Sequence, residues 1–113
     1  MTNTIFPIDL MKHYETPFYY YDLELLKATL HEMQSCIKGM PYKVHYAVKA
    51  NANPRILHEI KEAGLSIDCV SGGEIVAALA AGFKGDTIAF AGVGKTDNEI
   101  SLGINHDIFC FNV

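Results

Sequence analysis

Short apolar runs alternate with helix-like segments along the second two thirds of the chain. The apolar runs begin near Lys43, Ser66, Thr87 and Asp107, at intervals of about 20 residues. Strands and helices that alternate at this spacing are typical of successive strand–helix–strand units, whose right-handed crossovers give a parallel sheet. The pattern therefore predicts four parallel strands connected by short helices.

Residues that commonly start and stop helices lie between the predicted strands. Asn53-Pro54 is predicted to open the first helix, with Asn as the cap and Pro at the first helical position. Two later segments fit the capping box, a Ser or Thr followed three residues later by Glu: Ser71–Glu74 and Thr96–Glu99. Three glycines are predicted to close the three helices: Gly64, Gly82 and Gly103.

The first forty residues follow a different pattern. The run T-P-F-Y-Y-Y at residues 16–21 predicts a strand. Asp22 is a predicted N-cap, and apolar residues at three- and four-residue steps from Leu23 to Ile37 predict an amphipathic helix that ends near Gly39. We therefore expect an N-terminal strand and helix in residues 1–40 and the strand–helix repeat in residues 41–113.

The two faces of each predicted strand differ in polarity. In the first strand, Val44, Tyr46 and Val48 share one face, whereas His45, Ala47 and Lys49 share the other. The same alternation separates Ile67 and Cys69 from Ser66 and Asp68, Ile88 and Phe90 from Thr87 and Ala89, and Phe109 and Phe111 from Cys110 and Asn112. Strands of open doubly wound sheets usually read as continuous apolar runs. A closed barrel with a polar end to its interior fits this pattern better.

The predicted fold class is therefore α/β: a partial (β/α)8 TIM-type barrel of about the first four units, after an N-terminal strand and helix. A full barrel takes ~250 residues, and an isolated half would leave two edge strands unpaired. We therefore expect this chain of 113 residues to be a fragment, inactive by itself.

Composition and charge narrow the class of protein. The net charge of -4 argues against nucleic acid or an anionic membrane as the main partner, because both require a basic face. Three cysteines without a CxxC-type spacing make a disulfide framework or a metal site unexpected. The first residues show no signal peptide, and no apolar stretch reaches the ~20 residues that cross a bilayer. We expect a cytoplasmic location.

Lys49 is the residue whose type and place point most directly to chemistry. It ends a predicted strand, on the face that would line a barrel and at the carboxyl end where barrel enzymes place their active sites. A lysine there is partly desolvated, which disfavours its charged form, and a neutral amine is what Schiff-base formation with an aldehyde requires. The alternative is a lysine that ends an edge strand and points into water.

Four segments, in order, resemble the barrel-type pyridoxal-phosphate-dependent amino-acid decarboxylases, and among them the diaminopimelate decarboxylase family. They are T-P-F-Y-Y-Y-D (16–22), Y-A-V-K-A-N-A-N-P (46–54), D-C-V-S-G-G-E (68–74) and F-A-G-V-G-K-T-D-N-E-I (90–100). Alanine racemases share the lysine, but their segment has Tyr-Gly where this chain has Asn53-Pro54. Ornithine decarboxylases have Lys-Thr in place of Gly72-Gly73. Cys69 replaces a Val of the diaminopimelate pattern.

The resemblance implies roles for four residues. Lys49 would be the catalytic residue and would bind pyridoxal 5'-phosphate as a Schiff base. The small side chain of Ala47 would leave room for the pyridine ring, Asp68 would orient Lys49 or the cofactor, and Glu74 would lie near the cofactor. From the residues alone, Ala47 could equally serve strand packing, Asp68 could bond nearby backbone, and Glu74 could complete a capping box with Ser71.

The resemblance also implies an activity. It is the decarboxylation of meso-diaminopimelate to L-lysine and carbon dioxide. The full-length enzyme would have a C-terminal β-domain and would form a homodimer with shared active sites. Alternatives are a decarboxylase of the same fold acting on ornithine, arginine or carboxynorspermidine, or a non-catalytic homologue that binds the cofactor. From the pattern alone, an unrelated open α/β domain with an incidental lysine also stays open.

Overall fold

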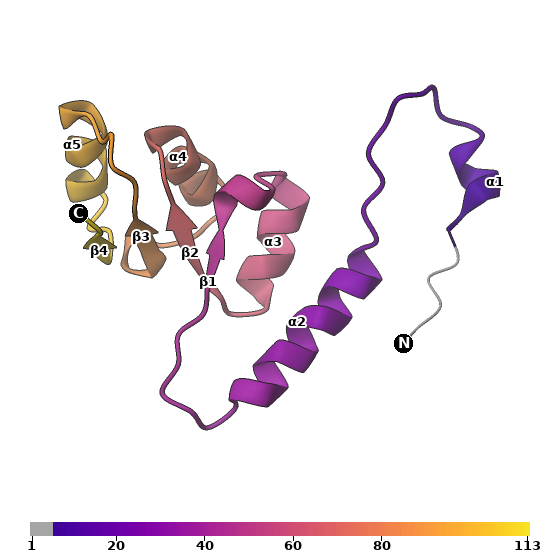
Figure 1. The fold of residues 1–113 in the computed structure, drawn as a ribbon, viewed down its shortest axis with the longest axis horizontal. Helices are drawn as coiled ribbons and strands as arrows, with labels where there is room; N and C mark the ends of the chain where they lie inside the picture. The colour runs from indigo at the N-terminus through magenta and orange to yellow at the C-terminus, as the bar shows by residue number, and fades with distance from the viewer. Residues whose placement is uncertain (1–5) are drawn as a thin grey trace.

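A four-stranded parallel sheet lies at the centre of the fold in a computed structural model that describes residues 6–113 (Figure 1). The strands are β1 (His45–Ala47), β2 (Ser66–Cys69), β3 (Ile88–Phe90) and β4 (Cys110–Phe111), and their order in the sheet is β1-β2-β3-β4. Each strand therefore pairs with its neighbour in sequence, as in a barrel, whereas a doubly wound sheet reverses direction at a switch point. The prediction of four parallel strands is confirmed.

The connecting helices pack on one face of this sheet. They are α3 (Pro54–Glu62), α4 (Gly72–Ala80) and α5 (Asp97–Asn105), with one-turn 3-10 helices η1 (Val48–Ala50) and η2 (Gly85–Thr87) at two strand ends. The side chains between sheet and helices form the buried core, which includes Leu57, Ile67, Ile75 and Phe90. The opposite face of the sheet has no helix over it in the described part of the chain (Figure 1).

Local sequence signals set most helix ends as predicted. The Asn53 side chain accepts a hydrogen bond of 3.0 Å from the N–H of Arg55, and Pro54 occupies the first turn of α3. At the start of α5, Thr96 and Glu99 form a full capping box. The N-termini of α3 and α5 are therefore fixed by side chains adjacent in sequence.

Gly103 does not close α5, contrary to the prediction. The helix continues to Asn105, and Gly103 is buried inside it. A Cβ atom at this position would lie 2.8 Å from Phe111 Cζ and 2.9 Å from Ile108 Cδ1. The glycine is therefore required for close packing of β4 and its approach against α5 rather than for ending the helix.

The alternation of faces predicted for the last strand is wrong at Phe109. Phe109 N donates to Ile88 O and Asn112 N donates to Phe90 O. Three residue steps along the last strand therefore match only two along β3. An extra residue of this kind changes the face to which side chains point. Phe111 packs against α5, whereas Phe109 is 57% exposed and lies beside His45, with 6.1 Å between ring centroids.

The N-terminal segment extends away from the sheet (Figure 1). It contains α1 (Ile8–Met11) and α2 (Leu23–Ile37), and the Asp22 side chain accepts a hydrogen bond from Leu25 N, as the predicted cap requires. The strand predicted at residues 16–21 is not formed, because no other strand lies beside this segment to bond its backbone. Its aromatic side chains are exposed, Tyr19 at 89%.

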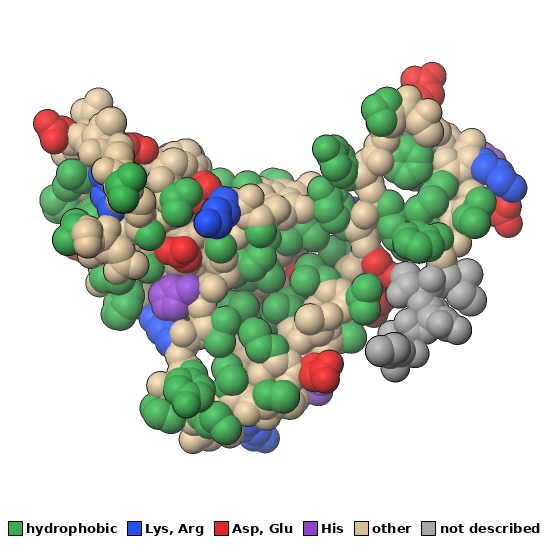
Figure 2. Space-filling view, in the orientation of Figure 1, with side chains coloured by type: hydrophobic (Ala, Val, Ile, Leu, Met, Phe, Trp, Pro, Cys, Tyr) green, Lys and Arg blue, Asp and Glu red, His purple; other side chains and the backbone are tan. Residues whose placement is uncertain are grey.

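Hydrophobic side chains gather on this N-terminal arm, at the right of Figure 2, where Tyr14 lies beside Phe18 and Tyr19 beside Tyr21. The radius of gyration is 16.5 Å, above the ~13 Å typical of a compact domain of about this length. The boundary placed at residue 40 stays a prediction. The N-terminal residues 1–5, which carried part of the signal-peptide interpretation, lie outside the described residues.

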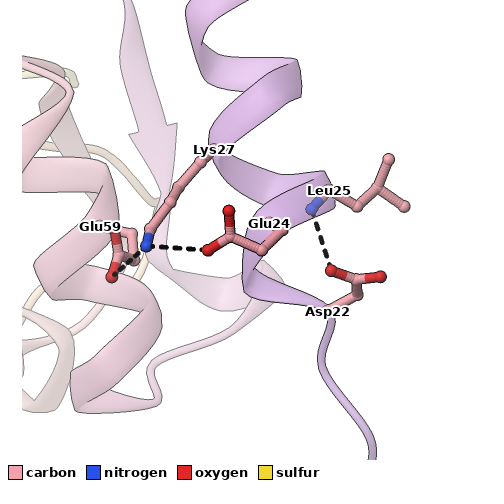
Figure 3. A network of polar contacts seen from close by, with 5 residues as sticks. All are labelled: Asp22, Glu24, Leu25, Lys27 and Glu59. Atoms are coloured by element: carbon pink, nitrogen blue, oxygen red, sulfur yellow. Dashed lines mark hydrogen bonds and ion pairs between the residues drawn. The ribbon is translucent and has the colours of Figure 1, made fainter. Parts of the chain in front are cut away.

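Helix α2 joins the arm to the sheet layer. Leu30 enters the core, and Lys27 Nζ lies 3.2 Å from the Glu24 carboxylate and 3.9 Å from that of Glu59 on α3 (Figure 3). Such half-exposed ion pairs contribute only about 0–1 kcal/mol to the free energy of unfolding. The apolar contacts of Leu30 therefore do more to hold α2 on α3 than the charges do.

Candidate active site

Lys49 lies at the carboxyl end of β1, but not on the strand itself. The strand ends at Ala47, and Lys49 is the middle residue of η1, where Val48 turns into the core and Lys49 is exposed. The expected desolvation of Lys49 is therefore absent in residues 6–113, because the inner face of the four-stranded sheet is uncovered. The turn itself lies against β2 and the start of α4, so its neighbours are the strand end and helix that carry Asp68 and Glu74.

The strand register places four side chains in one row beside this turn. Ala47 pairs with Asp68, Asp68 with Ala89, and Ala89 with Cys110. Their neighbours on either side, such as Ile67 and Phe90, belong to the core on the helix-covered face. The row therefore lies on the inner face, and three of its four side chains are small.

Asp68 is the one charged member of the row. Its side chain is half-buried and makes no hydrogen bond within residues 6–113. The alternative in which this carboxylate serves nearby backbone is therefore not observed. A carboxylate at the rim without a backbone partner is free to bind a cation or a donor group.

Glu74 has a structural contact that differs from the predicted one. Its Oε2 accepts a hydrogen bond of 2.7 Å from Val70 N, one residue before the cap, while Ser71 Oγ accepts one of 3.2 Å from Glu74 N. The capping box with Ser71 is thus only half formed. The Glu74 carboxylate instead holds the turn that follows β2.

Two titratable groups next to the site face the core. Burial, followed by the nearby carboxylates of Glu74 and Asp68, raises the pKa of the Cys69 thiol to about 12. Desolvation also raises the pKa of Tyr46, whose hydroxyl donates to the Asn51 carbonyl oxygen at 3.1 Å. Both groups stay neutral at neutral pH, so neither supplies charge to the site.

His45 lies on the same face of the sheet as Ala47, as the alternation along the first strand predicted. Its Nδ1 lies 3.1 Å from the carbonyl oxygen of Ile67, across the pair of strands β1 and β2. This position is two residues before Ala47 on the inner face, further from the rim than Lys49. The histidine therefore lies on the inner face of the sheet, nearer the amino end of β1 than the candidate site.

Sequence reasoning missed Ala89, Cys110 and Glu99 as neighbours of the site. The first two follow from the alternation of faces once the register is known, but the register depends on contacts between strands. Glu99 was explained by its capping box, which hid a second contact: its Oε1 accepts a hydrogen bond of 2.7 Å from Gly72 N. No local pattern shows that contact, because the two residues are 27 positions apart.

The residues fit a pyridine-ring aldehyde cofactor at this edge. Lys49 offers an exposed primary amine, the half-buried Ala47 and the buried Ala89 have small side chains, and Asp68 offers an anionic group between them. No cluster of three or more His, Cys, Asp or Glu side chains that could bind a metal ion is found among the described residues. None of their helices has the length and apolar character to span a membrane.

Comparison with known proteins identifies related sequences and folds. Residues 23–113 match the family described as pyridoxal-dependent decarboxylase, pyridoxal binding domain. Over 110 residues the chain is 57% identical to a diaminopimelate decarboxylase of Bacteroides thetaiotaomicron, covering 96% of this chain and 28% of that protein. The chain thus spans between a quarter and a third of the length of this relative.

Solved structures of decarboxylases have the same fold as this chain. A diaminopimelate decarboxylase from Helicobacter pylori complexed with L-lysine superposes with a TM-score of 0.85 and 38% identity, over 92% of this chain and 26% of that one. An ornithine decarboxylase from Entamoeba histolytica superposes with a TM-score of 0.77 at 24% identity, over 92% and 32%, a likeness of fold alone. The predicted partial barrel is confirmed by these neighbours.

Proposed function

This chain belongs to the pyridoxal-dependent decarboxylases, and we propose that the full-length protein decarboxylates meso-diaminopimelate to L-lysine and carbon dioxide. The observation that carries the proposal is the exposed amine of Lys49 at the carboxyl edge of a barrel-ordered sheet, beside the row of Ala47, Asp68 and Ala89. Relatives support the choice of substrate. The relative with 57% identity is named a diaminopimelate decarboxylase, and the Helicobacter enzyme was crystallised with the proposed product.

Lys49 would hold the cofactor covalently through Nζ. Its place on a 3-10 turn, with Val48 anchored in the core, fixes the backbone while the long side chain stays free to move. This suits an amine that must bond an aldehyde carbon, give way to a substrate amine and later return. The attacking form is the neutral amine, so completion of the barrel around Lys49 would favour the reaction by removing water.

Ala47 and Asp68 would shape the place next to that amine. A larger side chain at Ala47 would occupy the space that a flat ring needs above the sheet. The Asp68 carboxylate, which has no hydrogen bond in the described chain, would accept one from the Lys49 ammonium and so orient it before reaction. Glu74 would act through the turn at Val70, which it holds by its own hydrogen bond.

Pyridoxal phosphate, when bound, supplies the conjugated ring that takes up the electron pair left by the departing carboxylate. The residues of this chain contribute attachment, space and charge. They leave the selection of diaminopimelate over ornithine, arginine or carboxynorspermidine to other parts of the protein. A substrate panel on the full-length enzyme separates these amino acids.

Peptide mapping tests the assignment of Lys49. The full-length protein, loaded with pyridoxal phosphate and reduced with borohydride, should carry the reduced cofactor on the peptide that contains Lys49. Lys49→Ala should lose both this label and the release of carbon dioxide from diaminopimelate. Lys38→Ala, which removes an exposed lysine at the end of α2, should keep both. A label on another lysine would overturn the assignment.

We also propose a homodimer and a cytoplasmic location for the full-length protein. The first follows from the family resemblance, and sedimentation of the full-length protein tests it. The second is supported by three free cysteines, one of them exposed, in a chain without a disulfide among residues 6–113. Cell fractionation tests the location.

A further inference from the structure

The loop between β3 and α5 contacts the loops on both sides of it. Toward the loop that follows β2, Glu99 Oε1 accepts a hydrogen bond of 2.7 Å from Gly72 N at the start of α4. Toward the segment that follows β4, Lys95 Nζ donates to the carbonyl oxygen of Asn112. It also donates to that of Gly92 in its own loop. All these contacts lie at the carboxyl edge of the sheet, where Lys49 lies.

Glu99 does more than cap its own helix. Its Oε2 accepts from both the N–H and the hydroxyl of Thr96, each at 2.9 Å, which already completes the cap of α5. The other oxygen binds Gly72 N, one of the first N–H groups of α4, which have no partner within the helix. One carboxylate therefore serves the positive ends of two helices.

Gly72 is shaped for this contact. A Cβ atom at residue 72 would lie 2.9 Å from Glu99 Cγ, so any larger residue would push the carboxylate away. Gly73 has no such restriction, since its added Cβ would meet only Ser71 Oγ, at 3.8 Å. The glycine next to Ser71 is thus required for a close approach between two loops and not for the conformation of its own turn.

We infer that Glu99 is a positioning residue, which fixes the turn of residues 70–73 and thereby holds Asp68 and Glu74 in place beside Lys49. The turn lies between these two carboxylates in sequence, and the helix it opens lies against η1. The inference rests on the proposed function of Lys49, but the bridge from Glu99 to Gly72 is a separate physical claim. Glu99 itself does not touch the reacting atoms.

Two roles of Glu99 must be separated: the cap of α5 and the bridge to α4. Glu99→Asp keeps a carboxylate in the first turn, and Asp also completes capping boxes, but its side chain is one methylene too short to bridge to Gly72. Glu99→Gln keeps the length but has only one accepting oxygen for the two sides. Asp97→Asn is the matched control, because it removes the same charge from the same helical turn, and Asp97 makes no side-chain hydrogen bond in residues 6–113.

Amide hydrogen exchange on the full-length, cofactor-free protein tests the bridge. In Glu99→Asp and Glu99→Gln, exchange at residues 70–74 should rise at least tenfold, while α3 and β1 stay unchanged. In Asp97→Asn, residues 70–74 should exchange as in the wild type. An increase confined to α5, or none at all, would reduce Glu99 to a local cap and overturn the inference.

Steady-state kinetics and cofactor attachment test the consequence for the site. A misplaced site costs up to ~10²-fold in rate, so for Glu99→Asp we expect kcat about tenfold lower with KM changed less than about twofold. The rate of borohydride-trapped cofactor attachment at Lys49 should fall in parallel, and this readout does not depend on which amino acid is the substrate. Unchanged kcat and attachment in a variant whose turn exchanges faster would also overturn the positioning role.

Discussion

Substitution of Gly85 tests how closely η2 packs against the turn between α5 and β4. This turn lies at the amino ends of the strands, whereas Lys49 lies at the carboxyl end. Gly85 lies in η2 just before β3, and an added Cβ would overlap the carbonyl oxygen of His106 and lie 2.9 Å from that of Asp107. Both atoms are backbone, in the turn that leads from α5 to β4. Unlike the end of a flexible side chain, they move only if the whole turn moves.

The magnitude follows from two contributions. Ordinary contact begins near 3.4 Å, so the Asp107 oxygen would have to withdraw by at least 0.5 Å, and the His106 carbonyl by more. Overpacking of this kind costs about 1–3 kcal/mol. A shifted turn also loses one branch of the bond that Phe109 N shares between Gly85 O (3.0 Å) and Ile88 O (2.9 Å), worth at most ~1 kcal/mol. We expect Gly85→Ala to lower the free energy of unfolding by about 3 kcal/mol.

Urea unfolding of the full-length protein measures this change. Gly94→Ala is the matched control, because nothing lies within 4 Å of its added Cβ, and it should stay within ~0.5 kcal/mol of the wild type. A Gly85→Ala variant too unstable to purify would show the same effect as a lower yield of soluble protein than the control. A Gly85→Ala protein as stable as Gly94→Ala would refute the packing of η2 against the α5–β4 turn.

Three further predictions concern single groups. Cys69, buried and with its thiol pKa raised to about 12, should resist iodoacetamide at pH 8 in the folded protein and react after unfolding, as peptide mapping will show; labelling at the rate of the exposed Cys36 would contradict this. Asn53→Ala should lower the free energy of unfolding by about 0.5–2 kcal/mol in urea, since α3 loses its side-chain cap. Hydrogen bonds from Gly72 and then Thr96 lower the pKa of Glu99, so the folded state is favoured by this group above its unfolded pKa and loses that advantage as pH falls through the lower folded value. Exchange of the Gly72 amide, corrected for its intrinsic rate, should therefore stay protected at pH 4.5 and lose protection only at lower pH.

The sequence predicted best what neighbouring residues decide. Caps at Asn53 and Thr96 act within three residues of themselves, so the starts of α3 and α5 could be read directly. The face that each of β1, β2 and β3 turns to the helices also follows from alternation along a single strand. These features together were enough to predict a parallel sheet in sequential order.

The errors came from contacts between distant segments. The aromatic run at residues 16–21 has strand-like composition, but a strand needs a partner, and none lies beside it in the described structure. Gly103 resembles a helix terminator until Phe111 is seen to pack on it, and Phe109 changes face because β4 carries an extra residue relative to β3. Composition along one segment gives no information about the segment that will lie against it.

The same distinction applies to the candidate site. Lys49, Ala47, Asp68 and Glu74 were named from motifs, yet only the strand register brings Ala47 and Asp68 into one row, with Ala89 next to them. This row lies on the face that no helix of residues 6–113 covers, and β1 and β4 each leave one edge unpaired. Backbone groups at such edges require partner strands, and an amine requires a water-poor enclosure to react as a base or nucleophile. Strands that satisfied β1 and β4 would also close the inner face over Lys49. Closure of a barrel would therefore meet both the structural need of the sheet and the chemical need of the site.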